Sequence, residues 1–158
     1  MKAATIVEIR NELEHLNPDA LKQLCLRLAR FKLENKELLT YLLFESENEE
    51  SYVLTVTQFM DEQFENINTK SYFLIKKSVR KILRQVKKFS RYSNAKETEV
   101  ALLLHFCTKM KTLKPSIFNN KMLTNLYQRQ VSLTEKRMLN LHEDLQFDYN
   151  YKLNHLKQ

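Results

Sequence analysis

The sequence predicts an all-α protein of seven or eight helices, built as an irregular bundle or a short stack of helix pairs, with a long C-terminal helix. The 158 residues include no glycine, which tight two-residue β-hairpins and other positive-φ turns use most. Apolar residues recur at three- and four-residue steps through most of the chain. Polar residues that favour helix N-termini separate these periodic segments, so helices are expected throughout.

Two start signals define the first pair of helices. Thr5 with Glu8 has the spacing of a capping box, which predicts a helix to about Leu16. Asn17 and Pro18 are typical of the N-cap and the first position of a second helix. One side of this helix is apolar, as expected for a helix that packs on a neighbour. Its members are Leu21, Leu24, Leu28 and Phe31.

The next two helices follow Asn35 and Ser46. Asn35 is the predicted cap of a helix at 36–45, and Ser46 with Glu49 forms a predicted capping box for the helix after it. Apolar residues surround nearly the whole circumference of 36–45, so this helix is expected to be central. Residues 52–59 come nearest to a strand pattern, but apolar residues continue beyond them at helical spacing, so we predict helix.

The fifth helix should begin at Asn68 or Thr69, and the sixth at Asn94, which has Glu97 three residues later. The segment 97–110 is apolar nearly all round and is expected to be buried. The fifth helix is strongly amphipathic at 100° per residue. Its apolar side contains Tyr72, Ile75, Val79, Ile82, Leu83, Val86 and Phe89.

The C-terminal part is expected to hold one or two helices. Ser116 or Asn119 should begin the seventh helix. Ser132 with Glu135 begins an eighth, or the seventh continues to about Leu156. A stripe of apolar residues along this region either packs on the protein's own bundle or supports a homodimer through the C-terminal helix. The stripe consists of Met138, Leu141, Leu145, Tyr149, Leu153 and Leu156.

We therefore predict a helical domain at 1–131 and a C-terminal helix at 132–158, packed on the same domain and, in one alternative, continuous with the preceding helix. Helix pairs recur at a spacing of about 40 residues, which resembles HEAT-type repeats. The pairs share no motif, so an irregular bundle is the alternative. They cover 17–47, 48–93 and 94–131.

Two stretches, LCLRLARFKLENKELLTYLLFE and LYQRQVSLTEKRMLNLHEDLQFDY, are similar to an uncharacterised family of bacterial all-helical proteins. The similarity spans most of the chain. It implies a helical fold and no activity, so no site residue follows from it.

The sharpest functional signal is the segment 70–92, which carries nine Lys and Arg and no Asp or Glu. Most of these cations fall opposite the apolar side of the fifth helix, on a face roughly 20 Å long. Such a face can follow a phosphate backbone, and an arginine can bond two phosphate oxygens at once. The predicted anion- or partner-binding residues are Lys77, Arg80, Lys81, Arg84, Lys87, Lys88 and Arg91.

Two features oppose nucleic-acid binding. Residues 45–69 carry seven Asp and Glu and no Lys or Arg, and a short link joins them to the basic helix. Consecutive helices on a short link usually pack antiparallel, so the acidic segment could neutralise part of the basic face. Apart from Tyr92, we expect no aromatic residue on the basic side for a base to stack on. A merely solvated helix face is therefore an alternative to a binding face.

The chain lacks the motifs of several enzyme classes. Without glycine it has no P-loop, no GxGxxG turn and no GxSxG nucleophile elbow. Glu12 and His15 have the spacing of a di-iron ligand pair, but the second copy that such a site needs is missing. His105 lies in an apolar helix and is expected to be a hydrogen-bonded core residue. We predict no catalytic residue, no metal site and no cofactor.

Cysteine usage and hydropathy bear on the compartment. Cys25 and Cys107 lie inside apolar runs and are expected to be structural thiols in a reducing compartment. Glu8 and Arg10 interrupt the N-terminal apolar patch, which is unlike a signal peptide. No run approaches the roughly 18 uncharged residues of a membrane helix. A soluble cytoplasmic protein is expected.

These observations favour a non-enzymatic helical interaction or scaffold protein that presents a basic helix. Its expected partner is a protein or another acidic surface, and no membrane is involved. The alternative is nucleic-acid binding through phosphate contacts by residues 70–92. The net charge of +7 fits either partner.

Overall fold

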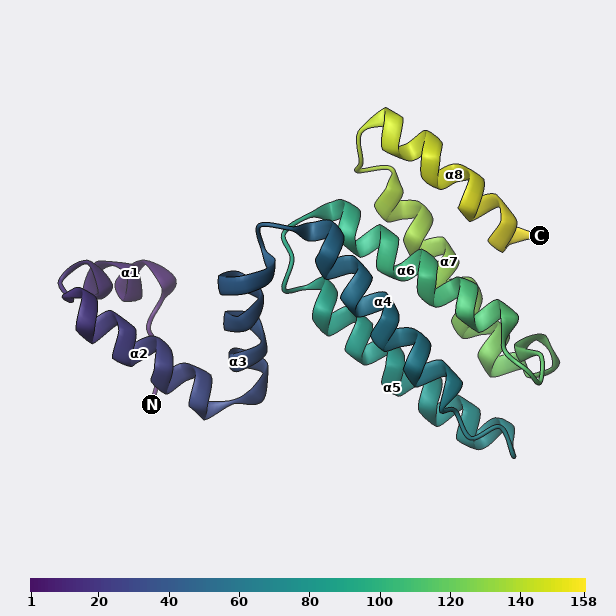
Figure 1. The fold of residues 1–158 in the computed structure, drawn as a ribbon, viewed down its shortest axis with the longest axis horizontal. Helices are drawn as coiled ribbons and strands as arrows, with labels where there is room; N and C mark the ends of the chain where they lie inside the picture. The colour runs from purple at the N-terminus through teal and green to yellow at the C-terminus, as the bar shows by residue number, and fades with distance from the viewer. The chain divides into compact units, whose positions relative to one another are not determined.

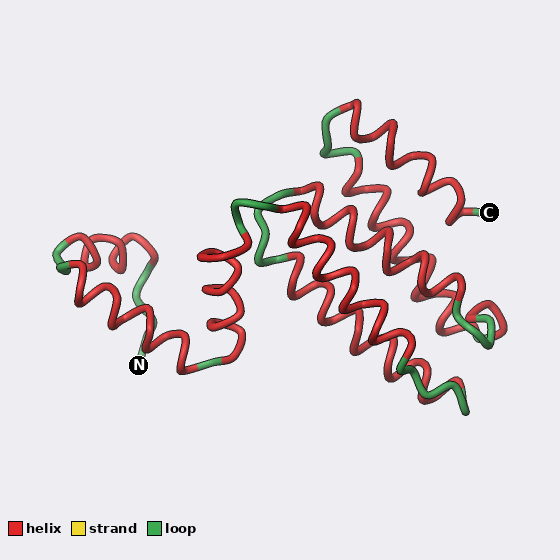
Figure 2. Tube along the Cα trace, viewed as in Figure 1, coloured by secondary structure: helices red, strands yellow, loops and turns green.

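The computed structural model describes residues 1–158, and every regular element in it is helical. Figure 1 shows the path of the chain, and Figure 2 shows helices joined by loops without a strand. Eight α-helices are present, with a π-helical turn at Tyr41–Glu45 and a 3-10 turn at Ile117–Asn119. The predicted all-α class is confirmed.

The chain forms two compact units, Met1–Phe44 and Glu45–Gln158. The helices of the first unit are α1 (Ile6–Glu14), α2 (Pro18–Phe31) and α3 (Leu33–Thr40). Those of the second unit are α4 (Glu49–Glu65), α5 (Tyr72–Ser90), α6 (Lys96–Thr112), α7 (Lys121–Met138) and α8 (Glu143–Lys157).

The first two helices begin where the sequence indicates. Glu8 N donates to Thr5 Oγ1 at 3.3 Å, and Thr5 N donates to the Glu8 carboxylate at 2.7 Å, so the predicted capping box is formed. Asn17 Oδ1 accepts a hydrogen bond from Ala20 N at 2.8 Å, and Pro18 is the first residue of α2. Both caps use donors that the first turn leaves without a helical partner.

The expected start of the third helix is wrong by three residues. Helix α3 begins at Leu33 without a side-chain cap, and Asn35 lies inside it. The amide of Asn35 instead donates to Leu28 O at 2.9 Å. It thereby satisfies a carbonyl in the last turn of α2, which the helix itself leaves free.

The expected central position of residues 36–45 is also wrong. None of the residues in α1, α2 or α3 is buried, and Leu42, Leu43 and Phe44 are exposed. A helix is buried only where other elements cover its whole circumference. Within this unit α3 packs mainly on α2, so much of its apolar surface has no covering partner.

The second unit is an antiparallel bundle built around α6. Successive helices from α4 to α8 run in opposite directions (Figure 1). Helix α6 packs on α4, α5, α7 and α8. In a stack of repeats, each repeat would contact only its neighbours along the chain, so this arrangement matches the irregular bundle.

The burial of α6 follows from this central position and confirms the sequence prediction for 97–110. Eight of its residues are buried, and at 100° per residue they spread over about 240° of the helix circumference. Phe106 is fully buried, and its ring packs against Phe64 of α4 with centroids 5.6 Å apart. The buried residues of α6 are Thr98, Val100, Leu102, Leu103, Leu104, Phe106, Cys107 and Met110.

Several helix starts of this unit differ from the predicted ones. The N-cap of α4 is Asn48 in place of Ser46, and that of α5 is Ser71 in place of Asn68 or Thr69. Helix α6 begins after Ala95 without a side-chain cap, so the predicted cap at Asn94 is wrong. Each of these links contains several polar residues, so the sequence pattern alone does not single out the helix start.

The start of α7 is divided between two caps. Ser116 caps the 3-10 turn, as its hydroxyl accepts from Phe118 N at 3.3 Å. Asn120 then caps α7 through a 3.2 Å hydrogen bond from Leu123 N.

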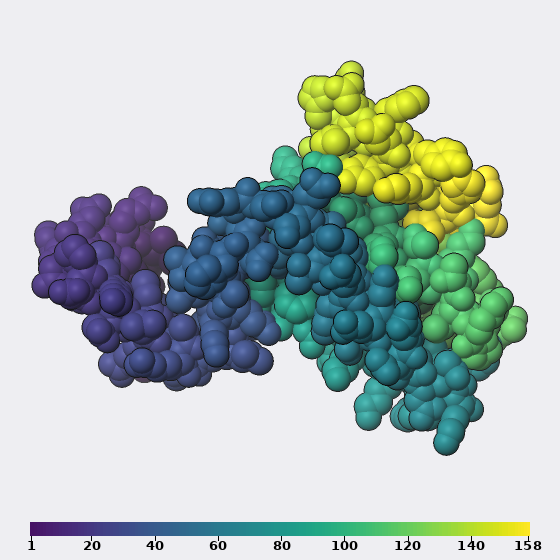
Figure 3. Space-filling view, in the orientation of Figure 1, coloured from purple at the N-terminus to yellow at the C-terminus, as the bar shows by residue number.

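The interruption between the last two helices comes later in the sequence than expected. Helix α7 passes Ser132 and ends at Met138, so neither a start at Ser132 nor one continuous helix to Leu156 is found. The predicted domain boundary at 131/132 thus falls inside α7. Helix α8 begins after His142 and packs on α6 and α7 (Figure 3).

The apolar stripe of this region faces the protein's own bundle. Met138, Leu153 and Leu156 are buried, and the other three members of the stripe are half-buried. Hydrogen bonds fix α8 further: Tyr127 Oη donates to Leu156 O at 2.7 Å, and Tyr149 Oη to the Glu97 carboxylate at 2.9 Å. The stripe is therefore occupied within one chain and offers little surface to a second copy.

Candidate functional site

Helix α5 separates apolar and basic side chains as predicted. Ile75, Val79, Ile82, Leu83 and Val86 are buried, while Tyr72 and Phe89 are half-buried. Six of the seven predicted binding residues are exposed, and Lys88 is half-buried. The exposed six, which we call the basic face, are Lys77, Arg80, Lys81, Arg84, Lys87 and Arg91.

Lys88 differs from the other six in its surroundings. Its ammonium group lies 4.8 Å from the centroid of the Phe89 ring. This cation–π contact and the partial burial of its stem hold Lys88 against the bundle. We therefore leave Lys88 out of the basic face.

The acidic residues of α4 form no ion pair with five of the six cations of the basic face. Lys77, Arg80, Lys81, Arg84 and Lys87 form no ion pair. The absence of ion pairs on five neighbouring cations leaves their charge directed at solvent.

Two carboxylates of α4, those of Asp61 and Glu49, have partners elsewhere in the bundle. Asp61 binds His105 and Lys109 of α6. The Glu49 carboxylate accepts hydrogen bonds from Ser93 Oγ at 2.8 Å and from Thr98 Oγ1 at 2.6 Å. Both acids therefore have partners on α6 or in the loop that precedes it.

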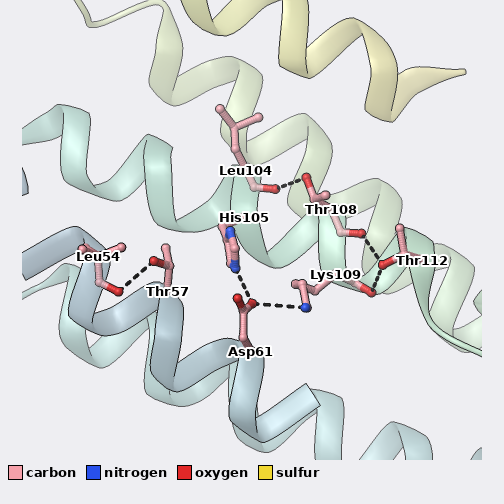
Figure 4. Close-up of polar contacts among 8 residues, drawn as sticks. All are labelled: Leu54, Thr57, Asp61, Leu104, His105, Thr108, Lys109 and Thr112. Atoms are coloured by element: carbon pink, nitrogen blue, oxygen red, sulfur yellow. Dashed lines mark hydrogen bonds and ion pairs between the residues drawn. The ribbon is translucent and has the colours of Figure 1, made fainter. Parts of the chain in front are cut away.

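Figure 4 shows the Asp61 cluster between α4 and α6. One carboxylate oxygen of Asp61 lies 2.6 Å from His105 Nε2 and 3.2 Å from Lys109 Nζ. Burial by itself would raise the pKa of Asp61, but the hydrogen bonds and charges of His105 and Lys109 outweigh it and lower that pKa below 3.8. His105 is hydrogen-bonded, as predicted, but 30% of its side chain is exposed, so its expected core position is wrong.

We expect acid to weaken this link. The pKa of Asp61 is lower in the folded state than in the unfolded chain, so its stabilising contribution exists above about pH 4 and is lost as the pH falls below 3.8. The variant Asp61→Asn should be less stable than wild type at pH 7, by up to about 1 kcal/mol, since the pair is partly exposed. Urea unfolding at pH 7 and pH 3 measures this difference, which should shrink in acid. Glu65→Asn, at an exposed carboxylate without a partner, should show no such change; an equal effect would refute the assignment.

A depression of about 490 Å³ lies on the N-terminal half of the basic face. Phe73, Lys76, Lys77, Arg80, Leu83 and Arg84 line it. Phe73 is 70% exposed, whereas Tyr92, the aromatic residue expected on this side, is buried. Sequence reasoning missed Phe73, although its spacing of four residues before Lys77 and seven before Arg80 places it on the same helix face.

A second group of cations lies on α7 and was also missed. Arg129 and Lys136 are exposed and line a depression of about 620 Å³ that also includes Leu133. Leu133 is shared with a depression of about 400 Å³ between α5 and α7, to which Lys87, Arg91 and Arg137 contribute. Arg137 is paired with Glu99 there, at 3.1 Å. Basic side chains from two helices therefore border the same surface.

The arrangement offers little support for catalysis. Burial raises the pKa of the Cys107 thiol to about 12, against a smaller opposite effect of Thr134, so the thiolate nucleophile is disfavoured. Burial also raises the pKa of Tyr127 to about 12. No three His, Cys, Asp or Glu side chains converge as a metal-ion site requires.

The two cysteines should react differently with a thiol reagent. Cys107 is fully buried, but Cys25 is exposed, so its expected burial is wrong. It lines an apolar depression between α2 and α3. We expect one thiol per native chain to react rapidly with a chromogenic disulfide, and the second only after unfolding. The single-cysteine variants Cys25→Ser and Cys107→Ser assign the two phases, and rapid native labelling of Cys107 would contradict the α6 packing.

No protein-family model, curated protein or solved structure matches this chain. The similarity to bacterial all-helical proteins therefore stays a prediction. None of the helices combines the length and the apolar character needed to cross a lipid bilayer.

Proposed function

We propose that the protein is a non-enzymatic interaction protein whose basic face binds the phosphate backbone of nucleic acid. The observation that carries this proposal is the set of five exposed cations on α5 without an ion pair. The acidic neighbour α4, which could have cancelled this charge, directs Asp61 and Glu49 to α6 and its preceding loop. We propose the cytoplasm as its compartment, in keeping with two free cysteines.

The geometry of the basic face suits a linear polyanion. From Lys77 to Arg91 the helix rises about 21 Å, at 1.5 Å per residue. Duplex nucleic acid presents one charge per roughly 1.7 Å of axis, so several phosphates lie within reach of this face. Arg80 and Arg84 can each donate two parallel hydrogen bonds to phosphate oxygens, which lysine cannot.

Nucleic acid fits this face better than an acidic protein does. The cations lie in one row along one helix, and no carboxylate of α5 interrupts them. A phosphate backbone is a continuous row of charge, whereas acidic protein surfaces are usually mixed with cations. The cations of α7 widen the same surface, because Arg129 and Lys136 lie beside the depression between α5 and α7.

Binding should be insensitive to sequence and steeply dependent on salt. With about five phosphates engaged, log K for a duplex should fall against log salt with a slope near −4.5. The affinity should therefore drop roughly 500-fold between 50 and 200 mM salt. Fluorescence anisotropy with labelled duplex and single-strand probes of two unrelated sequences measures both properties. Absence of binding to either probe at 50 mM salt would refute the proposal and leave an acidic protein as the partner to test.

A further inference from the structure

We infer that the preferred ligand of the basic face is single-stranded nucleic acid, with one base stacked on the ring of Phe73. This inference rests on the proposed function and specifies its substrate. It assigns a role to a residue that is neither part of the core nor charged.

Phe73 occupies an unusual position for a large apolar side chain. It lies in the first turn of α5 and is 70% exposed, on the side opposite the buried residues. At 100° per residue, Phe73 and the cations at +4, +7 and +11 fall within about 60° of arc. These cations are Lys77, Arg80 and Arg84. Phe73 therefore continues the row of the basic face at its N-terminal end.

The ring is free to accept a stacking partner. Phe73 takes part in no ring–ring contact, unlike the buried Phe64 and the half-buried Phe59 and Phe89. It borders the 490 Å³ depression together with Leu83 and four cations. An apolar ring beside several cations is the combination that non-specific single-strand binders use, in which bases stack and phosphates pair with cations.

The helix start around Phe73 is anchored on both sides. Tyr72 Oη donates to Ser116 O at 2.9 Å, and Lys76 Nζ lies 3.4 Å from Met122 Sδ of α7. Ser71 Oγ caps the helix by accepting from Leu74 N at 3.4 Å. The backbone of Phe73 is thus held in place before a ligand arrives, and preorganisation of this kind lowers the entropic cost of binding.

A single strand can use this arrangement, whereas a duplex cannot. The bases of a duplex are stacked and paired in its interior, so a ring beside the phosphates does not reach their faces. In a single strand the bases turn outward and stack on aromatic side chains. Lys77 and Arg80 lie about 6 and 10 Å further along the helix axis than Phe73, at 1.5 Å per residue, so both can pair with phosphates next to the stacked base.

The test uses the full chain and four variants of Phe73. The probes are an oligothymidylate of about 15 nucleotides and a duplex of equal length, within the size range of known single-strand sites. Phe73→Ala and Phe73→Leu should weaken oligothymidylate binding roughly 5- to 140-fold, the range found for one lost base stack. Duplex binding should stay within about twofold of wild type. Phe73→Tyr should restore single-strand affinity, because a phenol ring also stacks.

Phe73→Trp supplies a direct spectroscopic readout. The wild type contains no tryptophan, so this variant has a single indole at the proposed stacking position. Its fluorescence should be quenched on addition of oligothymidylate and should change little with the duplex. A merely structural role of Phe73 would produce no such difference between the two probes.

The outcomes separate this inference from the proposed function. Phe147→Ala is the matched control, since Phe147 is 80% exposed on α8, away from the basic face. It should leave binding of both probes unchanged. If the wild type binds duplex and single strand but Phe73→Ala retains full single-strand affinity, or if Phe73→Trp is not quenched, the stacking inference is wrong and phosphate binding stands. If neither probe binds, the proposed function itself fails.

Discussion

Replacement of Phe106 with alanine is expected to lower the free energy of unfolding of the unit at Glu45–Gln158 by about 3–5 kcal/mol. Phe106 is fully buried on α6, the helix that contacts all four others of this unit, and its ring packs against Phe64. Truncation removes this contact and leaves a cavity that the surrounding helices fill only in part. Urea unfolding followed by far-UV circular dichroism measures the loss, which is a large part of the roughly 5–15 kcal/mol of a typical domain.

The same substitution at an exposed position is the control. Phe147→Ala on α8 should change the free energy of unfolding by no more than about 0.5 kcal/mol, since Phe147 is 80% exposed. Should Phe106→Ala fail to fold, Phe106→Leu retains most of the apolar volume and should cost roughly 1–2 kcal/mol. A Phe106 variant as stable as wild type would show that α6 is not the centre of the bundle.

Two segments with the same sequence pattern differ in their burial in the structure. Residues 36–45 and 97–110 are both apolar nearly all round, yet the second is the core of a bundle and the first has large exposed apolar residues. The pattern reports which side chains would benefit from burial. It does not report whether the chain supplies neighbours on every side, which for α6 depends on four helices up to about 50 residues away.

Some helix starts follow from the local sequence, whereas others involve tertiary contacts. Thr5 and Asn17 stand next to clear first turns, and local hydrogen bonding alone predicts both caps correctly. In the link before α6, the Ser93 hydroxyl donates to Glu49 of α4 and accepts a hydrogen bond from Ala95 N, and α6 begins after Ala95 without a side-chain cap. The arrangement of this link thus includes a contact with α4, which the local sequence pattern does not predict.

In the candidate site, too, local sequence predicts one part of the arrangement, and tertiary contacts decide the other. Helical periodicity predicts the buried arc of α5 and its exposed cations correctly. Whether α4 cancels their charge depends on the direction of Asp61 and Glu49, which is set by their partners on α6 and in the loop before it. Phe73 could have been found from the helical wheel, since it shares a face with Lys77 and Arg80. An exposed phenylalanine is unexpected, because apolar residues are usually assigned to the core.

Reversal of three charges on the basic face is expected to abolish most of the salt dependence of nucleic-acid binding. The variant combines Arg80→Glu, Arg84→Glu and Lys87→Glu. Each lost phosphate contact reduces the slope of log K against log salt by about 0.9, so a slope near −4.5 should flatten to about −1.8. Binding of every sequence should weaken alike, by at least about 100-fold at 50 mM salt, because Coulomb attraction at three positions becomes repulsion. Lys88 is left intact because its contact with Phe89 belongs to the packing of the bundle.

The matched control reverses three cations elsewhere on the chain, Lys22, Lys36 and Lys114. All three are exposed and form no ion pair, and none belongs to α5. Each substitution changes the charge by two, so both triple variants fall from +7 to +1. If net charge alone attracted nucleic acid, both would lose affinity equally, and the assignment to the basic face would be wrong. A localised interface predicts that the control keeps the wild-type slope and loses only a small part of its affinity through long-range attraction, which salt screens within about 8–10 Å. Far-UV circular dichroism should show native helix content in both variants, because all six positions lie outside the core.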